Sequence, residues 1–222
     1  MHELTSWAAD RPLFRVTDAQ RHVELTPQSL HQTLHRLVDR GELHRLERGV
    51  YTAHDDPLIY ATHIETPSFL SLWSGLRFYD LTTQQPTTLQ VLVARARPAL
   101  DKIRFYQTRA LFGYGRHHYQ GFEVFVADRE RLLVDCLARP EVPVGALAEL
   151  LAEVAVDRTI TYAQRYGQAA VQKRVGYLLE RHRGVDVTAL RVDDRNYPPL
   201  DLAGPAKGPT DPDWRLRVNA DA

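Results

Sequence analysis

Residues 26–51 read TPQSLHQTLHRLVDRGELHRLERGVY, and this stretch decides the fold of the N-terminal part of the chain. Thr26 and Pro27 form a typical helix start. A threonine side chain accepts a hydrogen bond from a free amide of the first turn, and proline loses no hydrogen bond at the first helical position. Gly41 is a typical helix stop. The sequence therefore predicts a helix from Pro27 to about Arg40.

This helix has one apolar and one polar face. The apolar residues follow helical spacing and are predicted to face inward: Leu30, Leu34, Leu37 and Val38. The opposite face collects polar side chains, namely Gln28, Gln32, His35, Arg36 and Asp39, with Ser29 and His31 on its flanks. Glutamine reads adenine by a pair of hydrogen bonds, and arginine, serine and protonated histidine contact phosphates. Because the only carboxylate, Asp39, lies at the far end, we predict that this face lies against DNA.

A shorter helix is predicted just upstream. Thr17 and Gln20 have the spacing of a capping box, in which the threonine accepts from a first-turn amide and the glutamine reaches back to the cap. A helix over about residues 18–23 should follow. Two helices joined by a tight turn form a helix-turn-helix.

A short basic hairpin follows the longer helix. Two short runs flank Glu47-Arg48-Gly49, and Gly49 can take the positive φ that a tight hairpin needs. Arg45 and Arg48 are placed where such a hairpin touches the DNA backbone or enters the minor groove. The run PLFRV, residues 12–16, supplies a third strand. Together these elements predict a winged helix-turn-helix; the alternative is a helical hairpin used only for packing.

Bulk properties set the limits for function. The chain has 222 residues, and its 28 lysines and arginines equal its 28 aspartates and glutamates, so any DNA binding must rest on local placement of charge. No basic-then-apolar leader and no apolar run of the roughly 18 residues that span a bilayer is present. We expect a soluble cytoplasmic protein with no membrane partner. Cys136 lies in an apolar stretch and is expected to be a buried, reduced thiol.

The pattern changes after residue 56, so we predict an α+β protein with a winged helix-turn-helix domain over 1–56 and a mixed α/β C-terminal domain over 57–222. The second domain should open with a helix over 67–81 and continue with strands over 88–94, 103–108 and 122–127. Residues 113–121, with His117 and His118, are expected to connect strands as a loop. Helices should follow over 128–140, 144–155 and 169–184, and the chain should close with a strand over 214–218 that holds a buried Trp214.

The last long helix, over 169–183, is rich in cations. The sequence predicts four exposed basic side chains on it: Lys173, Arg174, Arg181 and Arg183. Two interpretations remain open, a solvated face or a second surface that contacts phosphates or a partner.

Metal and catalytic motifs are weak. His31 and His35 are four residues apart, but no glutamate stands in the HExxH position and no cysteine or carboxylate cluster lies nearby, so we predict no metal and no cofactor. Phosphate-binding GxxxxGK[ST], GxSxG and CxxC motifs are missing from the sequence. We predict that the protein is not an enzyme. A nuclease-like second domain remains the alternative, although Glu123 is followed two residues later by Phe125 and not by the lysine of an ExK strand.

Five segments occur in order along the chain: LVDRGELHRLERGVY (37–51), SLWSGLRFYDLTTQQPTTLQV (71–91), FVADRERLLVDCL (125–137), RVGYLLE (174–180) and DWRLRVN (213–219). Together they resemble the AbiEi family, the antitoxin and transcriptional-repressor component of bacterial type IV toxin–antitoxin systems. The resemblance implies a winged helix that binds inverted repeats in the promoter of its own operon and represses it. It also implies a C-terminal domain that neutralises a nucleotidyltransferase-like toxin in phage defence, without a stable complex as the rule.

From these observations we expect a sequence-specific repressor that binds double-stranded DNA as two copies, with a solitary winged-helix regulator as a further alternative. The expected base-reading residues, near the start of the recognition helix, are Gln28, Ser29 and Gln32. The expected contacts to the DNA backbone or minor groove are His31, His35, Arg36, Arg45 and Arg48.

Overall fold

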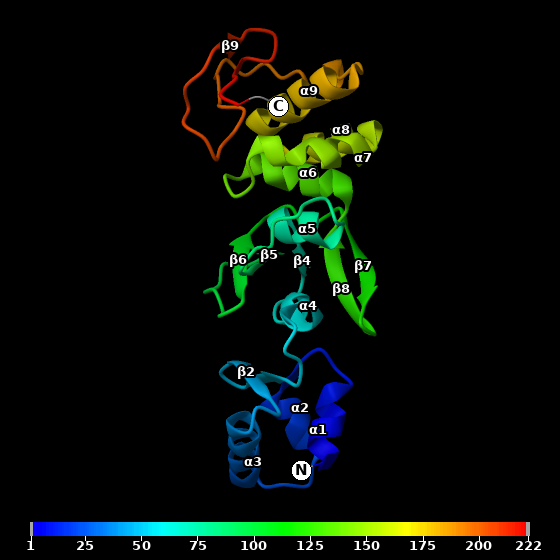
Figure 1. The fold of residues 1–222 in the computed structure, drawn as a ribbon, viewed down its shortest axis with the longest axis vertical. Helices are drawn as coiled ribbons and strands as arrows, with labels where there is room; N and C mark the ends of the chain where they lie inside the picture. Colours follow the sequence, from blue (N-terminus) through cyan, green and yellow to red (C-terminus); the bar gives the residue numbers. More distant parts are fainter. Residues whose placement is uncertain (1, 221–222) are drawn as a thin grey trace. The chain divides into compact units, whose positions relative to one another are not determined.

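The computed structural model describes residues 2–220 of the chain (Figure 1). Its contacts divide into two compact units. The first holds the residues up to 69 together with 87–108 and 116–125, and the second holds 70–86, 109–115 and the residues from 126 onward. The domain boundary after residue 56 stays a prediction, because compactness does not test which part of a chain folds alone.

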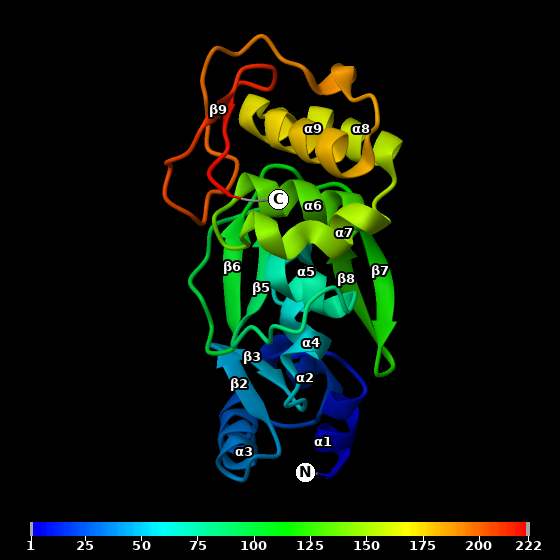
Figure 2. The same ribbon diagram turned by 45° about the horizontal axis from the view of Figure 1, so that its top comes forward.

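The first unit begins with three helices and a small sheet. The elements are α1 (His2–Ala9), β1 (Phe14–Arg15), α2 (Val16–His22), α3 (Pro27–Asp39), β2 (His44–Glu47) and β3 (Val50–Thr52). The three strands pair in the order β1-β3-β2, and both neighbouring pairs are antiparallel. Figures 1 and 2 both place α2 between α1 and α3. This arrangement confirms the predicted winged helix-turn-helix, including the third strand that residues 12–16 supply.

The core of this part is the apolar set that the helix spacing predicts. Its buried members are Leu4, Ala8, Phe14, Ala19, Leu30, Leu34, Leu37, Leu43 and Tyr51. Val38 is only partly buried and packs against the edge of this core. Burying aliphatic side chains such as these stabilises the fold by about 1.5–3 kcal/mol each. The three leucines of α3 therefore fix which face of the helix remains outside.

The start of α3 matches the prediction, and the start of α2 does not. The Thr26 side chain caps α3 by accepting from the amide of Ser29 at 3.2 Å, with Pro27 in the first turn. For α2 the cap is Arg15, whose amide donates to the Asp18 carboxylate at 2.9 Å. The predicted Thr17 capping box is therefore wrong. A carboxylate three residues after Arg15 is a stronger acceptor than the Gln20 amide, so the helix begins earlier.

The middle of the chain forms further short helices and a five-stranded sheet. The elements are α4 (Pro57–Tyr60), a 3-10 turn (Ala61–His63), β4 (Ser68–Leu70), β5 (Leu89–Val93), β6 (Ile103–Gln107), β7 (Tyr114–Tyr119) and β8 (Phe122–Ala127). The strand order is β6-β5-β4-β8-β7, and β5 pairs with β6 in parallel. These strands confirm the α+β class and the three strands predicted over 88–94, 103–108 and 122–127.

Two predictions for this region are wrong. Ser68–Leu70 is a strand, so the helix expected over 67–81 is confined to α5 (Leu72–Phe78). Short apolar runs do not distinguish a strand from a buried helix by periodicity. Residues 113–121 were expected to be a loop, but Tyr114–Tyr119 is β7. From Arg116 to Tyr119 the exposure alternates from residue to residue, the period of a strand, and neighbouring histidines hide this alternation in the sequence.

The second unit is mainly helical. Its elements after α5 are α6 (Arg129–Ala138), a 3-10 turn (Val144–Leu147), α7 (Ala148–Glu153), α8 (Val156–Tyr166), α9 (Ala169–Arg183), a second 3-10 turn (Thr188–Leu190), β9 (Thr210–Asp211) and β10 (Leu216–Arg217). The helices α6, α7 and α9 match the sequence prediction, whereas α8 is additional. Cys136 is 2% exposed, and burial raises the pKa of its thiol. Trp214 is buried as expected, at 3%.

The cations of α9 contradict the prediction of an exposed basic face. Lys173 is 2% exposed and Arg174 is 4% exposed. The Lys173 ammonium donates to the main-chain oxygens of Asp194 at 2.8 Å and Asn196 at 2.7 Å, and to the Asp194 carboxylate at 3.0 Å. Arg174 donates to the main-chain oxygen of Pro199 at 2.8 Å. Both side chains therefore hold the irregular C-terminal segment.

The end of α9 behaves in the same way. Arg183 lies at the surface, but its guanidinium donates to the main-chain oxygens of Leu151 and Ala152, each at 2.9 Å. Only Arg181 among the four predicted cations is exposed without a recorded hydrogen bond to the described residues. Three of the four cations that were expected on a second phosphate-contacting face are therefore engaged within the chain. Within residues 2–220, no helix is long and apolar enough to cross a bilayer.

Candidate nucleic-acid interface

The recognition helix α3 presents its polar face to solvent. Leu30, Leu34 and Leu37 are fully buried. The exposed positions on the other side are Gln28, His31, Gln32, His35, Arg36 and Asp39. Four of these residues, His31, Gln32, His35 and Arg36, line one shallow hollow on the helix surface. The structure thus brings most of the predicted contact residues of α3 onto one accessible face.

The side chains of this face differ in whether they already form hydrogen bonds within the chain. Gln28, His31 and Gln32 make no side-chain hydrogen bond to any residue in the described part of the chain, so their donors and acceptors are available. His35 Nδ1 lies 2.7 Å from the carboxylate of Asp39. The Arg36 guanidinium reaches back to the Thr33 hydroxyl at 3.3 Å. A base reader needs free hydrogen-bonding groups, and the two glutamines meet this requirement.

Ser29 is more constrained than its neighbours. It is half-buried, and its hydroxyl oxygen accepts from the Thr26 hydroxyl at 2.9 Å. Its amide is the group that Thr26 caps, at 3.2 Å. Ser29 therefore contributes to the helix start, and its hydroxyl hydrogen is still available to donate to a phosphate or a base.

The wing places two arginines at the surface. Gly49 has φ 79°, as the tight turn requires, and Arg45 and Arg48 are both exposed. The register of β2 against β3 shifts between Arg45 and Glu47, which is a bulge in the strand. A bulge increases the local twist and changes where the neighbouring side chains point. Arg45 Nε then lies 3.4 Å from the main-chain oxygen of Glu47, close to the wing tip.

The wing is anchored by Arg97, a residue that the sequence analysis missed. Its guanidinium lies 2.5 Å from the Glu47 carboxylate and 3.5 Å from that of Glu65. It also packs over the Phe105 ring, 4.5 Å from the centroid. The Arg97 side chain is only 13% exposed, so this cluster is less screened by water than a surface ion pair. No local pattern in the sequence could reveal a partner fifty positions away.

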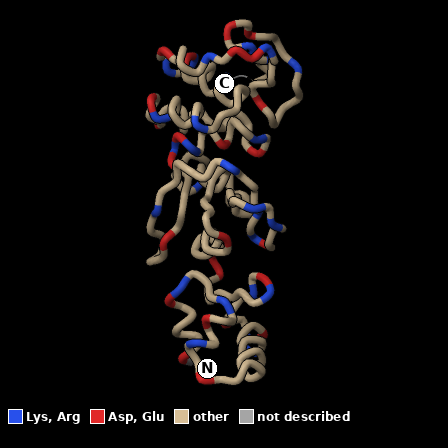
Figure 3. Tube along the Cα trace, turned by 180° about the vertical axis from the view of Figure 1, so that it is seen from behind, with Lys and Arg blue, Asp and Glu red and all other residues tan. Residues whose placement is uncertain are grey.

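Formal charge on α3 is low. Figure 3 shows a helix with few coloured residues, and Arg36 and Asp39 are the only lysine, arginine, aspartate or glutamate among its thirteen residues. The other exposed positive charges of the candidate site are Arg45 and Arg48 of the wing. The helix itself offers hydrogen-bonding groups of the kind that suit base edges.

Three acidic residues outside this face, Glu123, Asp128 and Asp135, have partners within the chain. Glu123 pairs with Arg116 at 2.8 Å, and Asp128 accepts from the Tyr162 hydroxyl at 2.9 Å. Burial raises the pKa of the Asp135 carboxyl, although Arg131 beside it, at 2.8 Å, favours the charged form. Among residues 2–220, no group of three or more histidines, cysteines, aspartates or glutamates is arranged to hold a metal ion.

A helix-turn-helix with an exposed polar recognition helix and a basic hairpin beside it defines the class: this is a winged helix-turn-helix fold. Residues 2–54 match the family model described as the AbiEi antitoxin transcriptional regulator, which confirms the resemblance for this segment. The match supports a role as a transcriptional regulator or antitoxin, and such regulators bind DNA.

A similarity that extends over nearly the whole chain is found with a solved structure. The crystal structure of the RV2827C protein from Mycobacterium tuberculosis is similar with a TM-score of 0.68 and 16% sequence identity. The alignment covers 97% of this chain and 89% of that chain. At this identity the likeness shows the fold alone. Among curated proteins, none is similar enough in sequence to count as a match.

Proposed function

We propose that this protein is a sequence-specific DNA-binding repressor of its own operon and the antitoxin of a type IV toxin–antitoxin pair. The observation that carries the proposal is the exposed face of α3 beside the arginine-bearing wing, within the segment that matches the AbiEi regulator model. A polar face with free glutamine side chains suits the major groove, and arginines on a hairpin suit the adjacent backbone or minor groove.

The proposed contacts divide by chemistry. Gln28, Ser29 and Gln32 read base edges near the start of α3. The remaining residues hold phosphates or the minor groove, and they are His31, His35, Arg36, Arg45 and Arg48. Two copies bind the two halves of an inverted repeat, because a two-fold related operator matches two identical recognition helices.

DNA binding is tested with the full chain and a labelled duplex of its own upstream region. Fluorescence anisotropy at several salt concentrations should give tight binding that weakens as salt rises, with a footprint over inverted repeats. A scrambled duplex of equal length and composition is the control. Equal affinity for both duplexes at every salt concentration would contradict sequence-specific repression.

The antitoxin role is tested in cells. Expression of a nucleotidyltransferase-like toxin from the same operon should arrest growth, and co-expression of this protein should restore it. The double variant Arg45→Ala, Arg48→Ala separates the two roles, because it should lose repression and still restore growth through the second domain. Promoter binding without any rescue of growth would identify the protein as a solitary regulator.

An enzymatic second domain is tested separately. Labelled DNA and RNA incubated with the protein and Mg²⁺ or Mn²⁺ should remain intact, as expected for a repressor. Cleavage that persists in the double arginine variant would assign a nuclease activity to the second domain.

A further inference from the structure

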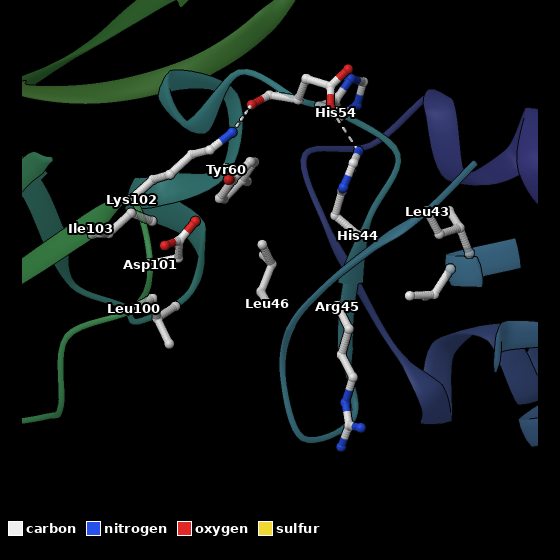
Figure 4. A pocket seen from close by; sticks show the side chains of 12 residues that line it. Leu43, His44, Arg45, Leu46, His54, Tyr60, Leu100, Asp101, Lys102 and Ile103 are labelled. Carbon is white, nitrogen blue, oxygen red and sulfur yellow. Dashed lines mark hydrogen bonds and ion pairs between the residues drawn. The ribbon is translucent and has the colours of Figure 1, made fainter. Parts of the chain in front are cut away.

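A cavity of about 340 Å³ lies beside the wing, within the first compact unit. Its walls come from the end of α3, from β2, from the segment 54–60 and from the residues that precede and begin β6 (Figure 4). Small-ligand pockets in proteins begin at about this size, at roughly 300 Å³. The exposed residues of α3 in the candidate DNA-contacting face do not line this cavity.

The lining is about equally polar and apolar, and five of its twelve residues are aliphatic. These aliphatic residues are Val38, Leu43, Leu46, Leu100 and Ile103. In Figure 4, Leu46 and Leu100 point into the space, and the Arg45 guanidinium points away from it. The cavity therefore suits the apolar body of a ligand, and Arg45 remains free for another role.

Tyr60 contributes a hydroxyl that has no partner. The residue is 5% exposed and lines the cavity, yet its hydroxyl makes no hydrogen bond to any residue from 2 to 220. The hydroxyl oxygen itself is accessible to solvent, because it is not one of the enclosed side-chain atoms that lack a partner. It is therefore available to form a hydrogen bond with a ligand in the cavity.

The charges around this hydroxyl favour a cation. Burial, together with the negative charges of Asp56, Asp101 and Asp55, raises the pKa of Tyr60 to about 12. Asp101 has no ion pair within the described residues, and Figure 4 shows it on the same side of the cavity as Tyr60.

Two basic side chains on the wall, Lys102 and His44, already have partners. The Lys102 ammonium donates to the main-chain oxygen of Asp55 at 3.3 Å. His44 Nε2 lies 2.8 Å from the Asp55 carboxylate. The Asp101 carboxylate and the Tyr60 oxygen therefore remain as acceptors for a positively charged donor.

We propose that this cavity binds a small organic cation, an apolar body that carries an ammonium or amidinium group. The charged group donates to the Asp101 carboxylate and the Tyr60 oxygen, while the body packs against the leucines. Since β2 forms one wall, occupancy orders the wing and tightens DNA binding; this regulatory part rests on the proposed function. A protein that a first ligand has already ordered binds the second with a smaller entropic cost.

The binding site is tested on the full chain by methyl NMR with three probes of one ring size. Benzylammonium should shift the signals of Leu46, Leu100 and Ile103 in a saturable way. Benzyl alcohol should bind about tenfold more weakly, because it lacks the charge, and benzoate should not bind. Equal binding of the three probes, or shifts scattered over the whole molecule, would overturn the proposal.

Two variants and a matched control assign the contacts. Asp101→Asn should weaken benzylammonium binding about tenfold, and Tyr60→Phe should weaken it severalfold with the ring still in place. Asp10→Asn removes an exposed carboxylate away from the cavity and should change nothing. The methyl spectra report whether each variant is folded. Benzylammonium affinity that is the same in all three variants would rule out the assigned contacts.

The regulatory part has its own readout. Saturating benzylammonium, at constant ionic strength, should tighten promoter binding severalfold in the wild type and not in Asp101→Asn. If benzylammonium shifts the cavity signals but leaves DNA affinity unchanged, the site stands and its coupling to DNA is refuted. If the wild type does not bind promoter DNA at all, the proposed function fails while the NMR result still decides the site.

Discussion

The helices α3 and α9 both carry polar and basic side chains, and the structure uses them in opposite ways. On α3 the polar face is exposed, and Gln28 and Gln32 are free to meet a ligand. On α9, Lys173 and Arg174 are buried and donate to main-chain oxygens. A basic run in a sequence therefore does not show by itself whether its charges face solvent.

The difference follows from the segment that packs on α9. Most of residues 191–209 have no regular secondary structure, so their main-chain oxygens lack the partners that a helix or a sheet would supply. Buried main-chain groups must still be paired. Long cationic side chains from α9 provide the donors. The α3 face has no such segment over it, which leaves its polar groups for a partner outside the chain.

The largest expected effect is on stability. Lys173→Met should lower the free energy of unfolding by about 3 kcal/mol, because it removes the three hydrogen bonds that the buried ammonium donates to Asp194 and Asn196. Urea unfolding followed by circular dichroism measures this loss. Arg181→Met, on the exposed side of the same helix, is the control and should stay within about 0.5 kcal/mol of wild type. Similar losses in both variants would remove the contrast between α3 and α9.

The next effect concerns sequence discrimination by α3. Gln32→Ala should reduce the preference for promoter over scrambled DNA by about 1–3 kcal/mol, the range for one bidentate base contact. Anisotropy titrations with both duplexes measure it. Gln85→Ala, an exposed glutamine of the second unit, is the matched control. A preference unchanged by Gln32→Ala would exclude this residue from base reading.

A smaller effect is expected at the wing. Arg48→Ala should weaken binding to promoter and scrambled DNA alike, by about 1 kcal/mol, and reduce the salt slope by about 1 because one phosphate contact is lost. Arg181→Ala is the comparison on α9 and should leave affinity and slope unchanged. A loss confined to the promoter duplex would instead show that Arg48 reads bases.

The smallest effect is a difference in acid sensitivity. The hydrogen bond from Lys173 lowers the pKa of the Asp194 carboxyl, and the Asn196 amide lowers it further. A depressed pKa contributes stability above the ordinary value of about 3.9, and this stability is lost as the pH falls below it. Wild type should therefore lose more stability than Lys173→Met between about pH 5 and pH 3. Parallel pH profiles of the two proteins would contradict this coupling.

Local chemistry made part of the fold predictable. The Thr26 cap, the leucine spacing of α3 and the glycine of the wing act over a few residues, and each is as expected. At the start of α2 either Arg15 or Thr17 could have been the N-cap residue. The sequence does not show that the bond from the Arg15 amide to the Asp18 carboxylate decides in favour of Arg15. Lys173 of α9 is buried because it bonds to a segment about twenty residues later in the chain. Helical periodicity cannot reveal such a distant partner.

The candidate site was predictable to a similar degree. The exposed positions of α3 and the hairpin arginines follow from helix spacing and turn chemistry. Arg97 and Tyr60 could not be found in this way, because their roles come from segments that only the tertiary fold brings together. Which residues touch DNA stays a prediction, since it depends on a partner outside the chain.

The ion pair between Arg97 and Glu47 affects the wing's electrostatics as well as its position. Glu47 directly precedes Arg48, so an unpaired carboxylate there would repel the same phosphate that the arginine attracts. A chain cut after residue 56 would keep the whole recognition helix but lose Arg97. Such a fragment would present an uncompensated anion at its hairpin tip, and it would bind DNA more weakly than the intact protein although none of its own predicted contact residues is missing.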